Sequence, residues 1–118
     1  MAASSFTGPG RKLVTADPTF EALGAYSRAA GAEVVKVPLT ATWGHDLARM
    51  MTAAGEKGLV YVCNPNNLTA TITPKGEISE LLSRAPAGVT ILVDEAYHHY
   101  AGSPDYQTFI PAVADHRI

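Results

Sequence analysis

An almost wholly apolar run, residues 90–93 (Thr-Ile-Leu-Val), ends abruptly in the two carboxylates Asp94 and Glu95. A strand that is apolar on both alternating faces is typical of the centre of a parallel sheet, because both faces of such a sheet are covered. Ligands of open α/β sheets bind outside the carboxyl ends of the strands. Asp94 stands at such an end, where a partly desolvated carboxylate requires a cationic or hydrogen-bonding partner. The run therefore predicts an α/β fold with a ligand site beside Asp94.

The chain has 118 residues, 47% of them hydrophobic, which is enough for one core and one domain. A net charge of −2 without a basic run argues against a nucleic acid or an anionic membrane as partner. No signal peptide pattern is present, and no apolar run approaches the roughly 20 residues that span a bilayer. The single cysteine, Cys63, excludes an internal disulfide, so we expect a cytoplasmic protein. His98 and His99 have no carboxylate at ligand spacing, and we predict no metal site.

Four segments with strand character alternate with three segments of helical periodicity. Strands are predicted over residues 13–16, 32–39, 59–63 and 89–93, and helices over residues 19–30, 46–54 and 73–85, with Thr73 as the cap of the last. The residues before Leu13 are rich in turn formers, and those after Tyr97 show no regularity. Because crossovers between parallel strands are right-handed, all four strand ends lie on one edge. The pattern predicts a three-layer α/β fold, a mostly parallel sheet with helices on both faces.

Four side chains follow three different predicted strands and therefore converge on this edge: Phe20, Asn67, Asp94 and Tyr97. An aromatic ring can stack, a carboxylate can pair with a ring N–H⁺, and an amide and a phenol can hydrogen-bond a ring oxygen. Together they would hold a flat, partly cationic heteroaromatic ligand. Three of these residues also have a simpler interpretation: Asp94 could satisfy loop amides, Asn67 could form only a turn, and Phe20 could pack in the core.

The segments around these residues resemble a known family. Residues 17–20 (D-P-T-F), 64–70 (N-P-N-N-L-T-A) and 94–97 (D-E-A-Y) together resemble the fold-type I pyridoxal 5′-phosphate (PLP) aminotransferases of class I/II, especially the histidinol-phosphate aminotransferase-like branch. The resemblance implies that Asp94 is the catalytic aspartate that pairs with the pyridinium nitrogen. It implies that Asn67 and Tyr97 donate to the phenolic oxygen of the cofactor and that Phe20 stacks on its ring. It also implies the strand order 2-1-3-4.

In two respects the chain departs from this family. The family reads N-P-T-G where this chain has residues 67–70 (N-L-T-A), so the loop lacks a rigid proline and a permissive glycine. The family's Schiff-base lysine and phosphate-binding turn lie outside the 118 residues. The resemblance thus implies that residues 1–118 are a partial PLP-binding large domain, truncated at both ends and inactive alone.

The complete protein is then expected to be a homodimeric aminotransferase. It would transfer an amino group between an amino acid, or an amino-alcohol phosphate, and a 2-oxo acid. Two other classes stay open on the residues alone. One is a non-catalytic α/β module that binds a small ligand at the same edge, and the other is a structural or interaction fragment.

Overall fold

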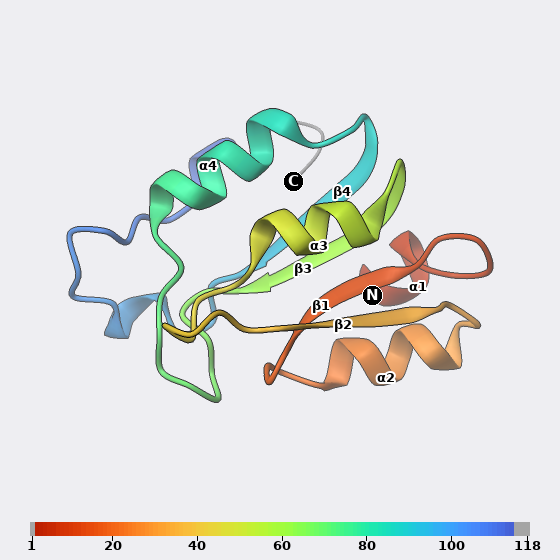
Figure 1. Cartoon of the computed structure of the whole chain (residues 1–118), viewed down its shortest axis with the longest axis horizontal. Helices are drawn as coiled ribbons and strands as arrows, with labels where there is room; N and C mark the ends of the chain where they lie inside the picture. The colour runs from red at the N-terminus through yellow and green to blue at the C-terminus, as the bar shows by residue number, and fades with distance from the viewer. Residues whose placement is uncertain (1, 115–118) are drawn as a thin grey trace.

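A single parallel sheet forms the centre of the protein (Figure 1). The computed structural model describes residues 2–114. The strands are β1 (Leu13–Asp17), β2 (Val34–Pro38), β3 (Lys57–Cys63) and β4 (Gly88–Asp94). They lie in the order β2-β1-β3-β4, and every pairing is parallel. This order confirms the sequence-based prediction and brings the ends of β1 and β3 together at the middle of the sheet.

Helices cover both faces of the sheet, as predicted. The helices are α2 (Ala22–Ala29), α3 (Leu47–Ala54) and α4 (Lys75–Arg84), and Figure 1 shows α2 on the side opposite α3 and α4. Successive side chains of a strand point to opposite faces, so β3 supplies both cores. Val60 and Val62 join the core under α3 and α4. Leu59, Tyr61 and Cys63 form the smaller core on the side of α2.

Predicted start and stop signals account for several element boundaries. Asp46 caps α3 by accepting a hydrogen bond from the Arg49 backbone N–H at 3.1 Å, which is the usual role of an N-cap carboxylate. Gly55 follows the last turn with φ of 67°, a conformation that glycine adopts without strain. Strand β2 ends at Pro38, which lacks the N–H that a longer ladder would need.

Regular structure also occurs where the sequence predicted none. A short helix, α1 (Ala2–Phe6), precedes β1 and packs against α2, with Ala3 buried. Beyond β4 the chain forms two 3₁₀ helices, η1 (His98–Tyr100) and η2 (Ile110–Ala114). These elements are too short for a hydrophobic period to show in the sequence, so periodicity could not have predicted them.

Two helices begin later than predicted because the hydroxyls before them are engaged elsewhere. Helix α2 begins at Ala22 rather than at Thr19, whose hydroxyl donates to Asn66 Oδ1 at 3.3 Å. Helix α4 begins at Lys75, and Thr73 does not cap it. Thr73 is buried and binds the side chain of His45 instead. A long-range contact therefore engages the hydroxyl of Thr73, which was predicted to cap α4, and another engages the hydroxyl of Thr19, where α2 was predicted to begin.

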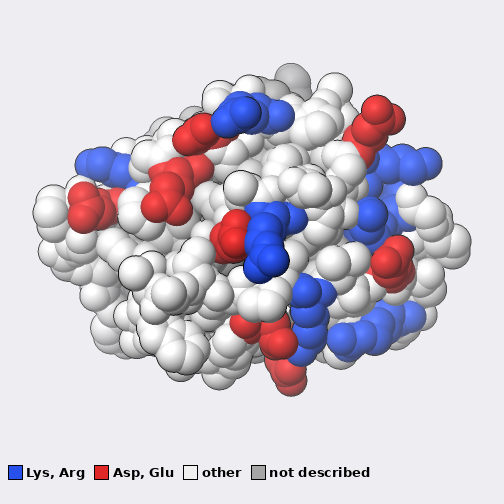
Figure 2. Space-filling view, in the orientation of Figure 1, with Lys and Arg blue, Asp and Glu red and all other residues white. Residues whose placement is uncertain are grey.

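Three kinds of site other than a ligand pocket are a charged surface patch, a membrane-spanning helix and a metal centre. Figure 2 shows basic and acidic side chains intermixed on one face of the molecule. Within residues 2–114, no helix is both long enough and apolar enough to cross a membrane. The same residues contain no group of three or more His, Cys, Asp or Glu side chains placed to hold a metal ion. The carboxyl edge of the sheet is therefore where a site is expected.

Candidate active site

The carboxyl ends of β3 and β4 lie side by side. Cys63 and Asp94 are paired in the register of the two strands. The backbone N–H of Asn64 then donates to the carbonyl oxygen of Asp94 at 2.9 Å, which continues the ladder by one bond. The loop that follows β3 and the residues that follow β4 therefore leave the sheet next to each other. This juxtaposition brings the sequence-predicted residues of the two loops to one place.

The carboxylate of Asp94 is held by a donor on each oxygen. Tyr61 Oη donates to Asp94 Oδ2 at 2.8 Å, and the Ala96 backbone N–H donates to Asp94 Oδ1 at 3.0 Å. Tyr61 lies in the middle of β3 and is only 2% exposed. Burial raises the pKa of its phenol, so the hydroxyl remains a donor. Tyr61 was not among the site residues predicted from the sequence. The signal that could have indicated it is an aromatic residue with a polar atom in an otherwise apolar strand.

Asn67 and Tyr97 line the same pocket, as predicted from their positions after β3 and β4. The pocket has a volume of about 360 Å³ and is lined by Pro65, Asn66, Asn67, Ala70, Ile72, Tyr97, Tyr100 and Ala101. Tyr97 is 47% exposed, and its ring lies 6.1 Å from that of Tyr100, measured between centroids. An amide and a phenol thus face a small space whose other walls are largely apolar. Such a space suits a flat ligand that carries a hydrogen-bonding oxygen.

Phe20 lies at the same edge but in a different pocket. It precedes α2 and is 46% exposed, so it is not a core residue of that helix. It lines a smaller pocket of about 110 Å³ on the side of β2, together with Lys36. The structure therefore brings Asn67 and Tyr97 together, with Asp94 at the neighbouring strand end, and leaves Phe20 in a separate hollow.

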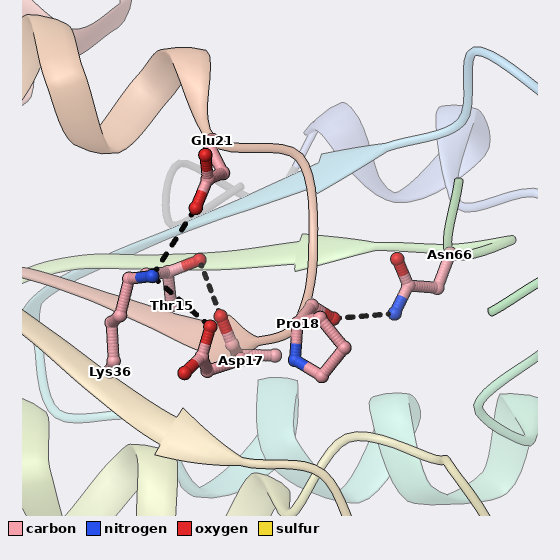
Figure 3. Close-up of polar contacts among 7 residues, drawn as sticks. Thr15, Asp17, Pro18, Glu21, Lys36 and Asn66 are labelled. Atoms are coloured by element: carbon pink, nitrogen blue, oxygen red, sulfur yellow. Dashed lines mark hydrogen bonds and ion pairs between the residues drawn. The ribbon is translucent and has the colours of Figure 1, made fainter. Parts of the chain in front are cut away.

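Asn66 joins the loops that carry Phe20 and Asn67. Its Nδ2 donates to the carbonyl oxygen of Pro18 at 3.0 Å, as Figure 3 shows, and its Oδ1 accepts from the hydroxyl of Thr19. Asn66 is buried, so these bonds are shielded from water. The sequence signal for this role was the presence of three asparagines among residues 64–67, of which only Asn67 was predicted to belong to the site.

A second buried network anchors the other end of the loop. Asn64 Oδ1 accepts a hydrogen bond from the Thr73 backbone N–H at 2.8 Å, and Asn64 Nδ2 donates to the Thr73 carbonyl oxygen at 3.1 Å. The hydroxyl of Thr73 lies 2.7 Å from Nδ1 of His45. His45 is 3% exposed, and within the described chain its Nε2 has no hydrogen-bond partner. Burial lowers the pKa of His45 to about 4, so the ring is neutral near pH 7.

Lys36, in the middle of β2, is engaged in two ion pairs. Its Nζ lies 3.1 Å from Asp17 Oδ1 and 3.4 Å from Glu21 Oε1 (Figure 3). The hydrogen bond to Asp17, followed by the charge of Asp17 and the contact with Glu21, raises the pKa of Lys36. A protonated, paired amine is a poor nucleophile, so Lys36 is not suited to form an imine with a carbonyl compound.

The loop of residues 64–71 closes on itself although it lacks the proline and glycine of the family pattern. Ala70 adopts a left-handed conformation with φ of 55°, and its N–H donates to the carbonyl of Asn66 at 2.9 Å. The backbone N–H of Leu68 donates to Asn66 Oδ1 at 3.3 Å, a bond that proline could not make. Alanine in this conformation is strained by roughly 1–2 kcal/mol because its Cβ approaches the following carbonyl.

Replacing Ala70 by glycine should therefore stabilise the protein. We expect Ala70→Gly to raise the free energy of unfolding by about 0.5–1 kcal/mol, since the relief of strain exceeds the greater freedom of glycine in the unfolded chain. Urea unfolding followed by circular dichroism measures it. Ala53→Gly, in the right-handed backbone of α3, is the matched control and should lower stability by about 1 kcal/mol. A destabilised Ala70→Gly would show that residue 70 is not left-handed in solution.

The family follows from comparison with known proteins. The model of the family described as aminotransferase class I and II matches residues 1–117. The chain belongs to this family. It is 42% identical over 99 residues to the histidinol-phosphate aminotransferase of Bacillus velezensis, covering 83% of this chain and 28% of that protein. It is 45% identical over 92 residues to the aromatic amino acid aminotransferase of Rhodococcus jostii, covering 77% of this chain and 26% of that protein.

Solved structures of aminotransferases share the fold. A crystal structure from Erwinia carotovora atroseptica, assigned as a histidinol-phosphate aminotransferase, matches with a TM-score of 0.85 and 26% identity over 95% of this chain and 35% of that one. The histidinol-phosphate aminotransferase of Sinorhizobium meliloti, solved in complex with pyridoxal 5′-phosphate, has the same fold with a TM-score of 0.74, at 24% identity over 85% of this chain and 27% of that one. The aminotransferase chain thus spans between a quarter and a third of the curated relatives named above.

Proposed function

We propose that this chain forms part of the PLP-binding domain of an aminotransferase, with Asp94 as its catalytic carboxylate. The observation that carries the proposal is the position of Asp94. Its carboxylate stands at the carboxyl end of β4, where donors on both oxygens orient it, and β4 lies beside the strand whose loop presents Asn67. Membership of the aminotransferase family supports this assignment. The chemistry would be the transfer of an amino group between an amino acid, or an amino-alcohol phosphate, and a 2-oxo acid.

The residues of the site fit the cofactor in chemical type. When bound, PLP supplies an electron sink for the reacting carbon. Asp94 would accept a hydrogen bond from the pyridinium nitrogen and hold the proton there by its negative charge. Asn67 and Tyr97 would donate to the phenolic oxygen, which is consistent with their places in one pocket. The family resemblance assigns Phe20 to stack on the ring; its side chain is exposed, but it lines a hollow separate from the pocket of Asn67 and Tyr97.

The cell compartment and assembly belong to the same proposal. The buried free thiol of Cys63 fits a reducing compartment, and we assign the protein to the cytoplasm. The complete protein is proposed to act as a homodimer, as the family resemblance implies. An interaction fragment would not need a carboxylate oriented at the strand end. A ligand-binding module without catalysis could use one, and membership of the aminotransferase family is the reason for preferring the enzyme.

Binding of the cofactor ring at this edge can be tested on the 118-residue chain itself. Pyridoxine 5′-phosphate has the ring, the phenolic oxygen and the phosphate of PLP but cannot form an imine. We expect it to shift the backbone amide signals of Asn67, Asp94 and Tyr97 in a heteronuclear NMR titration. The dissociation constant should be roughly 1 mM or weaker, because only about 4 kcal/mol is available without the covalent link.

Ribose 5-phosphate is the matched control ligand, since it carries the phosphate without an aromatic ring. It should leave these three signals unchanged at the same concentration. If pyridoxine 5′-phosphate shifts only signals of residues away from this edge, or if ribose 5-phosphate produces the same shifts, the edge of the sheet does not recognise the ring, and the proposed function loses its support.

A further inference from the structure

Packing does not explain the hydroxyl of Tyr61. The ring of Tyr61 lies in the small core with Leu13, Leu59 and Cys63, and phenylalanine would fill the same space. A buried hydroxyl needs a hydrogen-bond partner, since leaving it without one costs about 1–3 kcal/mol. Asp94 Oδ2, at 2.8 Å, is that partner. The hydroxyl therefore acts on the carboxylate proposed to be catalytic.

The contact leaves Asp94 free to accept a further hydrogen bond. An ionised carboxylate offers about four acceptor sites on its two oxygens. Tyr61 and the Ala96 backbone N–H occupy one site on each oxygen. Two donors on different oxygens fix the rotation of the carboxylate about its Cβ–Cγ bond, and the remaining sites are available to a ring N–H⁺. The arrangement prepares the carboxylate for a ligand rather than saturating it.

The orientation of the carboxylate also decides where a shared proton lies. When a carboxylate faces a pyridine nitrogen, the shared proton can lie on either partner. A carboxylate that is held in line with the ring nitrogen accepts a charge-assisted hydrogen bond from the ring N–H⁺, which favours the state in which the proton lies on the ring nitrogen. The buried phenol keeps its own proton and so remains the donor throughout.

We propose that Tyr61 is a positioning residue for Asp94: its hydroxyl, reaching across from β3, holds the β4 carboxylate in the orientation that keeps a bound pyridine ring protonated. The inference rests on the proposed function, since it requires that Asp94 meets the ring nitrogen. It concerns a contact within the core of the sheet, between residues 33 positions apart in the sequence.

The test measures the proton on the ring directly. Pyridoxine 5′-phosphate labelled with ¹⁵N in the ring is bound to the 118-residue chain, and the ¹⁵N shift is followed at a pH above the ring pKa of the free ligand. With the native chain we expect the shift of a protonated ring. Asp94→Asn should abolish that signature. Tyr61→Phe should move the shift most of the way to the unprotonated value, because a rotated carboxylate no longer accepts the hydrogen bond that keeps the proton on the ring nitrogen.

Controls separate this role from a general loosening of the core. Leu59→Val shortens a buried side chain on the same face of β3 without touching Asp94, and it should leave the ¹⁵N shift of the bound ligand unchanged. Tyr61→Phe added to Asp94→Asn should have no further effect. If Asp94→Asn abolishes the protonated signature while Tyr61→Phe preserves it, the positioning role is wrong and the proposed function stands. If Asp94→Asn itself leaves the signature intact, the proposed function fails as well.

Discussion

In the complete aminotransferase that we propose to contain this chain, Asp94→Asn should lower kcat by a factor of about 10²–10³, the loss typical of removing one preorganised electrostatic group from an active site. The side chain keeps its size but only one acceptor oxygen, so the change removes the negative charge and one of the two hydrogen bonds donated by Tyr61 and Ala96. Without that charge the ring nitrogen loses its proton and withdraws electrons less strongly. Steady-state kinetics with saturating cofactor and amino donor measure the effect.

The structure shows why alanine is the less clean substitution. Asp94→Ala would lower kcat at least as much, but it would also leave the buried hydroxyl of Tyr61 without an acceptor, at about 1–3 kcal/mol of stability. Asp94→Glu should keep part of the activity because it retains the charge. Asp17→Asn is the matched control: Asp17 ends strand β1, which β3 separates from β4, and it pairs with the exposed Lys36, so its loss should leave kcat within a few fold. An Asp94→Asn enzyme within a few fold of the native rate would contradict the assignment.

The second large effect is a loss of stability on acidification. His45 has a folded-state pKa of about 4, below the ordinary value of 6.5, so the unfolded chain binds a proton that the folded chain excludes. The contribution of His45 to the free energy of unfolding is therefore fully present above pH 6.5 and is lost as the pH falls towards 4. At about 1.4 kcal/mol for each pKa unit, His45 alone should lower the free energy of unfolding by about 3 kcal/mol between pH 7 and pH 4.

Urea unfolding at a series of pH values measures this dependence. His45→Asn removes the titrating ring and keeps a polar side chain near Thr73, and it should flatten the curve between pH 7 and pH 4 relative to the native chain. The exposed His99 is the matched control, because His99→Asn should leave the curve unchanged. If the native chain and His45→Asn lose the same stability over this range, His45 is not buried in the neutral form.

The sequence alone predicted the order of elements along the chain and the edge at which a site would form. Apolar runs bounded by glycine and proline predicted β1, β3 and β4 to within a few residues, because strands buried on both faces have a local signature. The position of Asp94 after such a run, with Asn67 and Tyr97 in neighbouring loops, followed from the same pattern. The strand order came from the family resemblance, since a parallel pairing leaves no trace in local sequence.

Only the tertiary structure decided which polar groups meet. Tyr61 pairs with Asp94 across 33 residues, Asn66 with Pro18 across 48, and His45 with Thr73 across 28. None of these pairs has a local periodicity, and the hydroxyl of Thr73, which was predicted to cap a helix, contacts His45 instead. The physical reason is that a buried polar group must find a partner wherever the packed chain brings one. That partner depends on the register of the sheet and the closure of the loops, which exist only once the chain has folded.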